Sequence, residues 1–352
     1  MLRILELFGG IGACSKALER LGIEYEIADY VEIDKYAVSS YNAMHHTNFE
    51  PQDICKWDKD IEVDLAMHGS PCQDFSIGGK QAGGDEGSGT RSSLMYETLR
   101  IVDKLRPKYV IWENVKNMIS KKHIHNFNNY IDRMKELGYI SYYQVLNAKD
   151  YGIPQNRERV FTISIRKDLN KGFAFPPKQE LKLKLKDMLE DNVEEKYYLS
   201  EKALNYILDI NDVQVGTKWE GSTSKGSINK PIAMTIGCRS AANQRAGITN
   251  YVVDNEDREI TVKEAKLRIK NATDLRIRKL TPKECWRLMD FDDIDFEKAS
   301  KVNSNTQLYK QAGNSIAVNV LEAILYSLLV EPSTNNENII EGQTSIFDFI
   351  NE

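Results

Sequence analysis

The first half of the chain alternates short apolar runs with stretches in which apolar residues recur at helical spacing. The short runs predict strands at residues 3–8, 26–31, 63–68, 109–112, 141–146 and 159–165. The helical spacing predicts helices at residues 14–21, 35–43, 94–104 and 123–137. This alternation favours a doubly wound α/β fold with a mostly parallel sheet, whose ligands lie at the carboxyl ends of the strands.

The alternation stops after Ile165. Residues 167–196 are rich in Lys and Glu, and residues 216–231 are rich in Gly, Ser, Thr and Lys. Helical periodicity returns at 315–329, where the apolar residues that would share one face are Ile316, Val320, Ile324 and Leu328. We therefore predict a larger domain, a smaller domain with its hinge and a flexible acidic tail, at residues 1–185 plus 304–330, 186–303 and 331–352.

Composition narrows the class of protein. The 352 residues are 41% hydrophobic, which is enough for one large core and a smaller one. No run of about 18 apolar residues indicates a membrane span, and the N-terminus begins with a predicted strand rather than a signal peptide. The five cysteines include no CxxC pair, so we expect neither a disulfide framework nor a zinc site. A monomer in a reducing cytoplasm, without a metal, fits this composition.

The charge is unevenly distributed. The net charge is −5, and the five acidic residues of 331–352, a segment without Lys or Arg, account for all of it. The rest of the chain is neutral, but residues 260–280 carry seven basic side chains and two acidic ones. A neutral body with one basic segment is compatible with binding to nucleic acid, although bulk charge alone does not indicate it.

A glycine-rich turn follows the first predicted strand, at Phe8-Gly9-Gly10-Ile11-Gly12. Glycines between a strand and a helix let a ligand approach the backbone at the helix N-terminus. Glu32, at the end of the next predicted strand, could accept hydrogen bonds from ribose hydroxyls. The spacing is not GxGxxG, which favours a nucleoside cofactor over a dinucleotide. A tight turn and a surface acid would give the same pattern.

A proline–cysteine pair follows the third predicted strand, within Gly69-Ser70-Pro71-Cys72-Gln73. Most single cysteines are inert core residues, but this one lies in a polar loop at a strand's carboxyl end, where a nucleophile is expected. The glycine-rich stretch that comes next, residues 78–93, predicts a lid that closes over the site.

Two further strand ends carry charged residues. Glu113, within Trp112-Glu113-Asn114-Val115, could protonate a ring nitrogen while a thiol adds to the ring, or could be a helix N-terminal acid. Arg157 and Arg159 are two residues apart at the start of a predicted strand, so they should point the same way, toward a base carbonyl and a phosphate. A solvated edge with surface salt bridges is the alternative.

Together these motifs resemble the cytosine-C5 DNA methyltransferase family, of bacterial or phage type. The series continues with Arg278-Lys279-Leu280-Thr281-Pro282-Lys283-Glu284 and Gln311-Ala312-Gly313-Asn314-Ser315, and covers the chain from Ile4 to about Leu329. The one departure is Ser70, where the family more often has a bulky residue or a proline before Pro-Cys. The resemblance implies a Rossmann-like, S-adenosylmethionine-dependent methyltransferase with a target-recognition domain.

The resemblance also implies which residues bind S-adenosylmethionine and release S-adenosylhomocysteine. Glu32 would hold the ribose, Ile33 would cover the adenine face, and Asp53 would meet the adenine amino group. The remaining cofactor residues would be Phe8, Gly10, Gly12 and Leu94, with Asn314 and Ile316 closing the pocket from a last helix that packs beside the first strand.

For catalysis, the resemblance makes Cys72 the nucleophile that adds to carbon 6 of a flipped-out cytosine, positioned by Pro71. Glu113 would contact N3 of the base and Arg159 its O2, with Arg157 near the DNA backbone. In the smaller domain, Thr235-Ile236 looks like the family's Thr-plus-apolar signature. The residues that would contact duplex DNA are Gln73, Thr235, Arg239, Gln244 and Arg245.

Three alternatives stay open. An RNA cytosine-C5 methyltransferase would carry similar motifs, but the long segment between Arg159 and Arg278, with its Thr-Ile signature, favours duplex DNA. A DNA-binding module without catalysis would not need all the reactive residues. A nicotinamide oxidoreductase would need a different glycine spacing, and it gives no role to Pro71 and Cys72.

The acidic tail carries a separate pattern, Gln343-Thr344-Ser345-Ile346-Phe347. It looks like the short peptides that dock on bacterial sliding clamps, with Ile346 and Phe347 as apolar anchors and Gln343 as an orienting amide. The alternative is that the apolar residues of the tail fold back onto the body as a short amphipathic segment.

Overall fold

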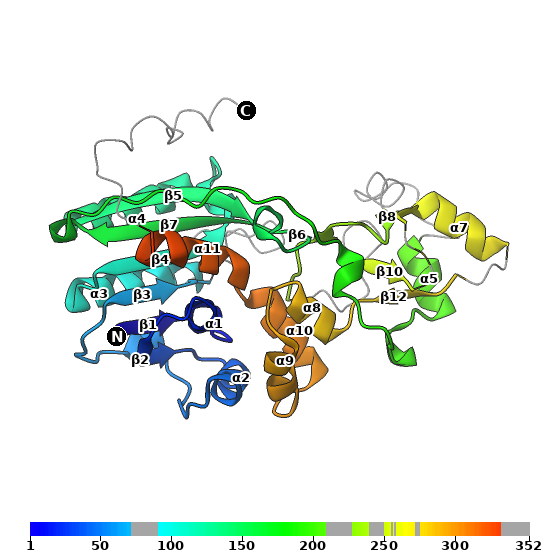
Figure 1. Cartoon of the computed structure of the whole chain (residues 1–352), viewed down its shortest axis with the longest axis horizontal. Coiled ribbons are helices and arrows are strands. Elements are labelled where there is room, and N and C mark those ends of the chain that lie inside the picture. Colours follow the sequence, from blue (N-terminus) through cyan, green and yellow to red (C-terminus); the bar gives the residue numbers. More distant parts are fainter. Residues whose placement is uncertain are drawn as a thin grey trace. The chain divides into compact units, whose positions relative to one another are not determined.

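The computed structural model describes residues 1–71, 91–208, 227–238, 250–254, 256, 258–271 and 275–331. The chain forms two compact units (Figure 1). Unit 1 comprises Met1–Leu146, Glu158–Lys178 and Val320–Glu352, and unit 2 comprises Asn147–Arg157 and Gln179–Asn319. These boundaries differ from those of the predicted domains, because residues 147–157, 179–185 and 304–319 belong to the second unit. The assignment of functional domains stays a prediction, as does the tail after residue 331, which lies outside the described residues.

Unit 1 is built on a six-stranded sheet in the order β2-β1-β3-β4-β7-β5, which Figure 1 shows stacked from bottom to top. The strands are β1 Leu2–Leu7, β2 Tyr25–Val31, β3 Leu65–His68, β4 Tyr109–Val115, β5 Tyr139–Asn147 and β7 Glu158–Arg166. Strand β1 pairs in parallel with β2 and β3, and β3 pairs in parallel with β4. Strand β7 pairs antiparallel with β4. The predicted mostly parallel sheet is confirmed.

The helices of unit 1 cover both faces of this sheet. They are α1 Ala13–Arg20, α2 Lys35–His45, α3 Met95–Leu105, α4 Ile124–Glu136 and most of α11 Val318–Leu329. Leu5 and Leu7 of β1 pack in one core cluster with residues of α3 and α4. The alternate residues, Ile4 and Glu6, point to the opposite face and are also buried, so that face is covered as well.

The prediction of the last helix, 315–329, was wrong about where the helix begins. Helix α10, Asn305–Asn314, ends where the predicted helix 315–329 was to begin, and α11 starts only at Val318. The break occurs because Ser315 has extended backbone angles, φ −71° and ψ 159°, which no helix continues through. Ile316 therefore lies between two helices and not on the apolar face of α11.

The α10–α11 segment, 305–329, has the length and mean hydropathy of a membrane span. However, 61% of its most apolar window is buried inside the protein. A buried core helix can have the same length and mean hydropathy as a membrane-spanning helix.

Unit 2 combines short strand pairs with helices. Its strands are β6 Gln155–Asn156, β8 Ser227–Ile228, β9 Ala233–Met234, β10 Tyr251–Val253, β11 Ile260–Thr261 and β12 Ile277–Lys279. Its helices are α5 Glu201–Leu208, α7 Val262–Lys270, α8 Pro282–Arg287, α9 Asp293–Ser300 and α10. The pairs are β10 with β12, β8 with β11, and β6 with β9. A core cluster that includes Tyr251, Ile260 and Ile277 joins the first two pairs and α7.

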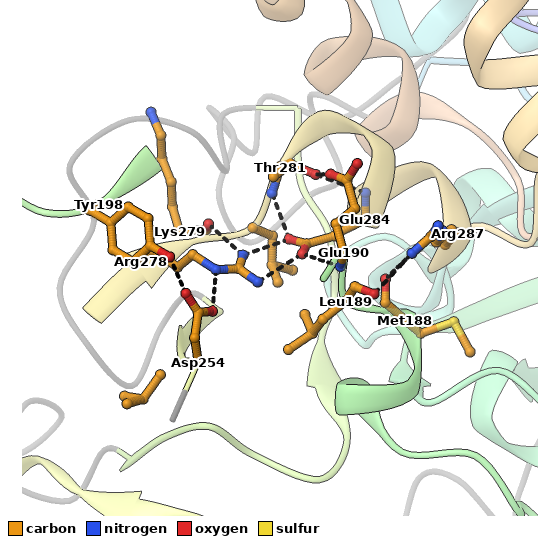
Figure 2. Close-up of polar contacts among 12 residues, drawn as sticks. Met188, Leu189, Glu190, Tyr198, Asp254, Arg278, Lys279, Thr281, Glu284 and Arg287 are labelled. Atoms are coloured by element: carbon orange, nitrogen blue, oxygen red, sulfur yellow. Dashed lines mark hydrogen bonds and ion pairs between the residues drawn. The ribbon is translucent and has the colours of Figure 1, made fainter. Parts of the chain in front are cut away.

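A buried arginine organises the middle of unit 2, as Figure 2 shows. The guanidinium of Arg278 donates two parallel hydrogen bonds of 2.9 Å to the Glu284 carboxylate, and both side chains have no exposed surface. A third bond of 2.6 Å reaches Asp254. Glu284 also closes the capping box of α8 by accepting from the Thr281 backbone N–H at 2.7 Å. The fully paired ions thus hold β10, β12 and α8 in one arrangement.

Candidate functional site

The candidate site of unit 1 follows from the direction of its strands. Because β1, β2, β3 and β4 are parallel, the residues that follow them come to one edge of the sheet. These residues are the glycine-rich turn after β1, Glu32 and Ile33 after β2, Gly69 to Pro71 after β3, and the end of β4 with Glu113. The sheet topology thus brings together segments that are far apart in the sequence.

The glycine-rich turn is a tight loop between β1 and α1. Gly12, the residue before α1, has a φ of 81°, and a side chain there would come within 2.4 Å of His45 and 2.8 Å of Tyr41. Only glycine therefore fits both the backbone angle and the space. The Gly12 N–H donates to the Gly9 carbonyl at 3.0 Å, which closes the turn.

Glu32 is connected to this turn by a hydrogen bond. Its carboxylate accepts from the Gly10 N–H at 3.2 Å and from the Asp34 N–H at 2.8 Å. Burial raises the pKa of Glu32, and the backbone donors act in the opposite direction. Next to it, the Ile33 side chain is 69% exposed. An acid with an exposed apolar neighbour could bind a polar sugar and a flat ring side by side.

Asp53 is brought to the same region by its neighbour. The Gln52 N–H donates to the Glu32 carbonyl at 2.8 Å, and the Gln52 amide donates to Asp29 at 3.0 Å. Asp53 itself caps a short 3₁₀ helix, Ile54–Lys56, by accepting from the Cys55 N–H at 3.0 Å. Its second carboxylate oxygen is not used in that cap.

Of the remaining predicted cofactor-binding residues, two apolar ones border the core of unit 1 and two others belong to unit 2. Phe8 and Leu94 both pack against the core cluster that contains Leu7 and Met95. Asn314 ends α10 and Ile316 follows it, both within unit 2. The residue before Asn314, Gly313, approaches another backbone closely: a side chain there would lie 2.2 Å from the Cys238 nitrogen. Glycine is required for this contact.

Glu113 and Arg159 form an ion pair at the ends of two antiparallel strands. In the register of β4 and β7, Glu113 pairs with Phe161 and Val115 pairs with Arg159, so the Glu113 and Arg159 side chains are diagonal neighbours on one face. Arg159 Nε lies 3.0 Å from the Glu113 carboxylate, and the side chains are 16% and 11% exposed. An acid held by a cation in a largely buried position could bind an uncharged base at its hydrogen-bonding edge.

The segment that leads to the predicted nucleophile is anchored to β4. Ser70 is buried, and its hydroxyl accepts from the Trp112 indole N–H at 3.0 Å. Pro71 is half-buried. Cys72 and Gln73 lie outside the described residues, as do residues 78–90 of the predicted lid.

Arg157 and Arg159 have different partners. It lies just before β7, in unit 2, and is buried. Its guanidinium donates to the carbonyls of Ile236 at 2.9 Å, Gly313 at 3.2 Å and Ser315 at 2.7 Å. The prediction of a phosphate contact assumed that both arginines belong to one strand, whereas the chain leaves strand geometry between β6 and β7. Arg157 instead holds three loop carbonyls of unit 2.

The Thr-Ile signature is joined to the segment that precedes Arg157. The Thr235 side chain is exposed but donates to the Asn156 carbonyl at 2.7 Å, and the Ile236 N–H donates to the Gln155 amide at 2.9 Å. Gln155 also donates to the Leu288 carbonyl at 2.6 Å. The sequence pattern around Arg157 and Arg159 did not indicate this structural role. The other predicted DNA contacts, Arg239, Gln244 and Arg245, lie outside the described residues.

Glu6 is a polar residue of this region that the sequence pattern did not single out. It lies in β1 two residues before Phe8 and is 2% exposed. Its carboxyl group accepts from the Ser15 hydroxyl in the first turn of α1 and from the Tyr41 hydroxyl at 3.1 Å. Burial raises the pKa of Glu6 to about 7, against the opposing effect of these two donors. Glu6 thus links the strand before the glycine-rich turn to the helix after it.

Comparison with known proteins places this arrangement in a family. The model of the C-5 cytosine-specific DNA methylase family matches residues 2–329, nearly the whole of the described fold. The chain belongs to this family. Its mostly parallel sheet with helices on both faces is thus the Rossmann-like fold of S-adenosylmethionine-dependent methyltransferases. The members are enzymes that methylate cytosine in DNA, and this methylase shares their activity.

Relatives of this methylase match over most of their length. The type II methyltransferase M2.ScrFI of Lactococcus lactis subsp. cremoris is 33% identical, covering 93% of this chain and 99% of that protein. The type II methyltransferase M.HhaI of Haemophilus parahaemolyticus is 34% identical, covering 93% and 94%. Among solved structures, the Entamoeba histolytica methyltransferase EhMeth has a TM-score of 0.70 at 19% identity, covering 93% of this chain and 98% of that one, which supports the fold alone.

The residues at the sheet edge fit the cofactor that the family and fold imply. S-adenosylmethionine is a nucleoside with a positively charged sulfonium, so it needs an acceptor for its ribose hydroxyls and a surface for its adenine. Glu32 and the exposed Ile33 supply these two features next to a turn whose Gly10 and Gly12 carry no side chains.

Replacing Glu6 should change how stability depends on pH. The carboxyl group has a pKa of about 7 in the folded chain against 4.5 in the unfolded one, so its protonated form favours folding. This contribution is complete below pH 4.5 and is lost as the pH rises to about 7, by on the order of 3 kcal/mol. Glu6→Gln cannot titrate. Between pH 5 and 8, the wild-type melting temperature should therefore fall relative to that of Glu6→Gln.

The control is Glu24→Gln, which removes an exposed carboxylate from the turn after α1. Its melting temperature should follow that of the wild type across the same pH range. If Glu6→Gln also follows the wild type in parallel, Glu6 does not titrate in the folded protein at this pH.

Proposed function

We propose that this methylase modifies carbon 5 of a flipped-out cytosine in duplex DNA through a covalent bond from Cys72 to carbon 6. The observation that best supports the proposal is the Glu113–Arg159 pair, which lies at the same sheet edge as the Ser70–Pro71 segment. Glu113 belongs to β4, and Ser70, two residues before Cys72, is hydrogen-bonded to Trp112 of the same strand, which supports a thiol and an acid that act on one ring.

The chemistry explains why these residue types are needed. Carbon 5 of cytosine is a poor nucleophile, and addition of the Cys72 thiolate to carbon 6 makes carbon 5 enamine-like. Negative charge would accumulate at N3, where the Glu113 carboxyl group donates a hydrogen bond or a proton. S-adenosylmethionine, when bound, supplies an electrophilic methyl group. Carbon 5 accepts this group and loses its proton, and the Cys72–carbon 6 bond then breaks by elimination.

Arg159 has two tasks in this scheme. It keeps Glu113 oriented through their ion pair, and it donates to O2 of the cytosine. Arg157 has a supporting task instead of a DNA contact, because its guanidinium is used by the carbonyls of Ile236, Gly313 and Ser315. In the cofactor pocket we assign the ribose to Glu32, the adenine to Ile33 and Asp53, and the remaining contacts to Phe8, Gly10, Gly12, Leu94, Asn314 and Ile316.

Unit 2 would select the target. A cytosine within a duplex is out of reach, so it must be extruded at a cost of a few kcal/mol, which contacts in the pocket offset. We assign target reading to Arg239, Gln244 and Arg245, since Arg and Gln match the edges of guanine and adenine, with Thr235 and Gln73 nearby in the scheme. Relatives from a bacterium and from a phage are named as a type II and an orphan methyltransferase, which supports a cytoplasmic enzyme that meets duplex DNA.

A methylation assay with duplex DNA and transfer RNA as parallel substrates tests this assignment. We expect 5-methylcytosine in duplex DNA at one short sequence, found by mapping modified cytosines in bacterial genomic DNA treated with the enzyme. Modification of the RNA alone would replace duplex DNA with RNA as the substrate.

Cys72→Ser should abolish turnover and leave S-adenosylmethionine binding nearly intact, because a serine hydroxyl is a far weaker nucleophile at neutral pH. The measurements are methyl transfer from labelled cofactor and calorimetric binding of the cofactor. Duplex DNA with 5-fluorocytosine at the target should trap wild-type enzyme covalently, since fluorine cannot leave as a proton does. A Cys72→Ser protein that methylates at the wild-type rate would contradict the mechanism, as would active enzyme that is never trapped.

Glu113→Gln should slow methyl transfer by about a hundredfold or more and weaken DNA binding little, because the carboxyl group matters most where charge develops. Single-turnover rates and DNA dissociation constants separate the two effects. Glu158→Gln is a matched control, since Glu158 is exposed and pairs with Lys116 at 3.3 Å near the same strand ends. Equal losses of rate and of binding in Glu113→Gln would make Glu113 a structural residue.

The tail pattern at 343–347 supports a second partner, a bacterial sliding clamp. A flexible tether to a clamp would raise the local concentration of the enzyme on newly replicated DNA without a new contact in the catalytic unit. A peptide of residues 341–352 should bind a clamp in a fluorescence anisotropy titration, and Phe347→Ala should remove the binding. A chain that ends after Pro332 should keep its melting temperature and its activity on short duplexes. A drop of several degrees would instead mean that the tail is part of the fold.

A further inference from the structure

The residues that hold Ser70 lie on the side of β4 opposite Glu113. Successive side chains of a strand leave opposite faces, so Trp112 and Asn114 share one face and Glu113 takes the other. The Trp112 indole N–H donates to the Ser70 hydroxyl at 3.0 Å, and the Asn114 amide donates to the Ser70 carbonyl at 3.4 Å. All three residues are buried.

The indole of Trp112 is a rigid donor. Its ring lies 4.1 Å from that of Tyr130, 5.7 Å from that of Phe127 and 5.8 Å from that of His68. His68 is in turn held at its Nε2, which lies 2.9 Å from the Tyr130 hydroxyl. Burial lowers the pKa of His68 to about 3, so this ring is neutral at physiological pH and puts no charge beside the indole. The direction of the indole N–H is therefore fixed by packing.

The Asn114 amide is oriented as well. Its carbonyl oxygen accepts from the Val115 backbone N–H at 2.8 Å, which turns its NH₂ group toward Ser70. One residue before the Pro71–Cys72 pair, both the hydroxyl and the carbonyl of Ser70 are thus bonded to the strand that carries Glu113. A residue without a hydroxyl at this position would leave the indole N–H buried without this acceptor, which is unfavourable.

We propose that Ser70 is a positioning residue: its hydrogen bonds to Trp112 and Asn114 hold Ser70 at the end of β4, and so set where the chain leaves toward the nucleophile relative to Glu113. The inference rests on the proposed role of Cys72. Serine at 70 and tryptophan at 112 are complementary in this chain, because the buried indole N–H donates to the Ser70 hydroxyl, which also lies 3.5 Å from the Asn114 amide nitrogen.

The test is Ser70→Ala in the full-length enzyme. We expect the single-turnover rate of methyl transfer to fall about tenfold. A tenfold change in rate corresponds to the free energy that one hydrogen bond typically contributes. The rate of covalent trapping by 5-fluorocytosine DNA should fall in the same proportion, while cofactor and DNA dissociation constants change by less than about twofold. Ser70→Thr, which keeps a hydroxyl, should restore most of the trapping rate.

Trp112→Phe removes the donor of the same hydrogen bond. This variant replaces Ser70→Ala in the test if Ser70→Ala folds poorly. In a double-mutant cycle, Ser70→Ala with Trp112→Phe should lose little more rate than either single variant, because both remove one interaction. A structural effect alone would lower rate and stability without this coupling.

Two controls match these variants in burial and in chemistry. Ser164→Ala removes a buried hydroxyl of β7 that lies 2.7 Å from the Ser141 hydroxyl, and Trp286→Phe removes an indole N–H that donates to the Leu308 carbonyl at 3.0 Å. Both should lower the melting temperature and keep the wild-type trapping rate. The proposal is overturned if Ser70→Ala traps DNA as fast as the wild type, or if the controls slow trapping equally. Wild-type enzyme that methylates DNA and is never trapped would instead overturn the role of Cys72.

Discussion

The alternation of side chains along β4 is the constraint on which the site depends. At the end of this strand, Glu113 leaves one face toward Arg159, and Trp112 and Asn114 leave the other toward Ser70. A shift of the strand by one residue would exchange the two faces and separate the acid from its arginine. Strand β4 cannot shift easily, because it is paired on one side with β3 and on the other with β7, and its residues from Val110 to Asn114 are buried.

Burial of polar groups explains why several polar residues of the sequence motifs have structural roles. A buried charge or amide is costly unless it is paired, so each must find partners within the fold. Arg157 finds three carbonyls, Gln155 finds the backbone of Leu288 and Ile236, and Arg278 finds Glu284 and Asp254. These residues lie in motifs of the C-5 cytosine-specific DNA methylase family, yet their contacts join loops and strands of unit 2. A motif therefore contains both reacting residues and the residues that hold its loops.

Two largely buried carboxyl groups lie near the glycine-rich turn of unit 1. Glu6 and Glu32 are two carboxyl groups whose pKa values burial raises, and both are bonded to the segments around the glycine-rich turn. The turn has little room for adjustment, because Gly12 has a left-handed backbone and lies against His45 and Tyr41. Hydrogen bonds from both sides thus shape a turn in which three of the five residues are glycines.

The sequence alone determined the order of strands and helices in unit 1 and the family, and it supplied the residues proposed to react. It could do so because hydrophobic periodicity and motif spacing are local properties. Tertiary structure decided the partners. Arg157 and Arg159 are two residues apart, but a break between β6 and β7 sends one into unit 2 and the other to Glu113. The apolar spacing at 315–329 predicted one helix, but extended angles at Ser315 divide it. Ser70 looked like a neutral departure from a motif, and its task depends on an indole 42 residues away. Pairing across such distances is set by strand order and packing, which no local pattern encodes.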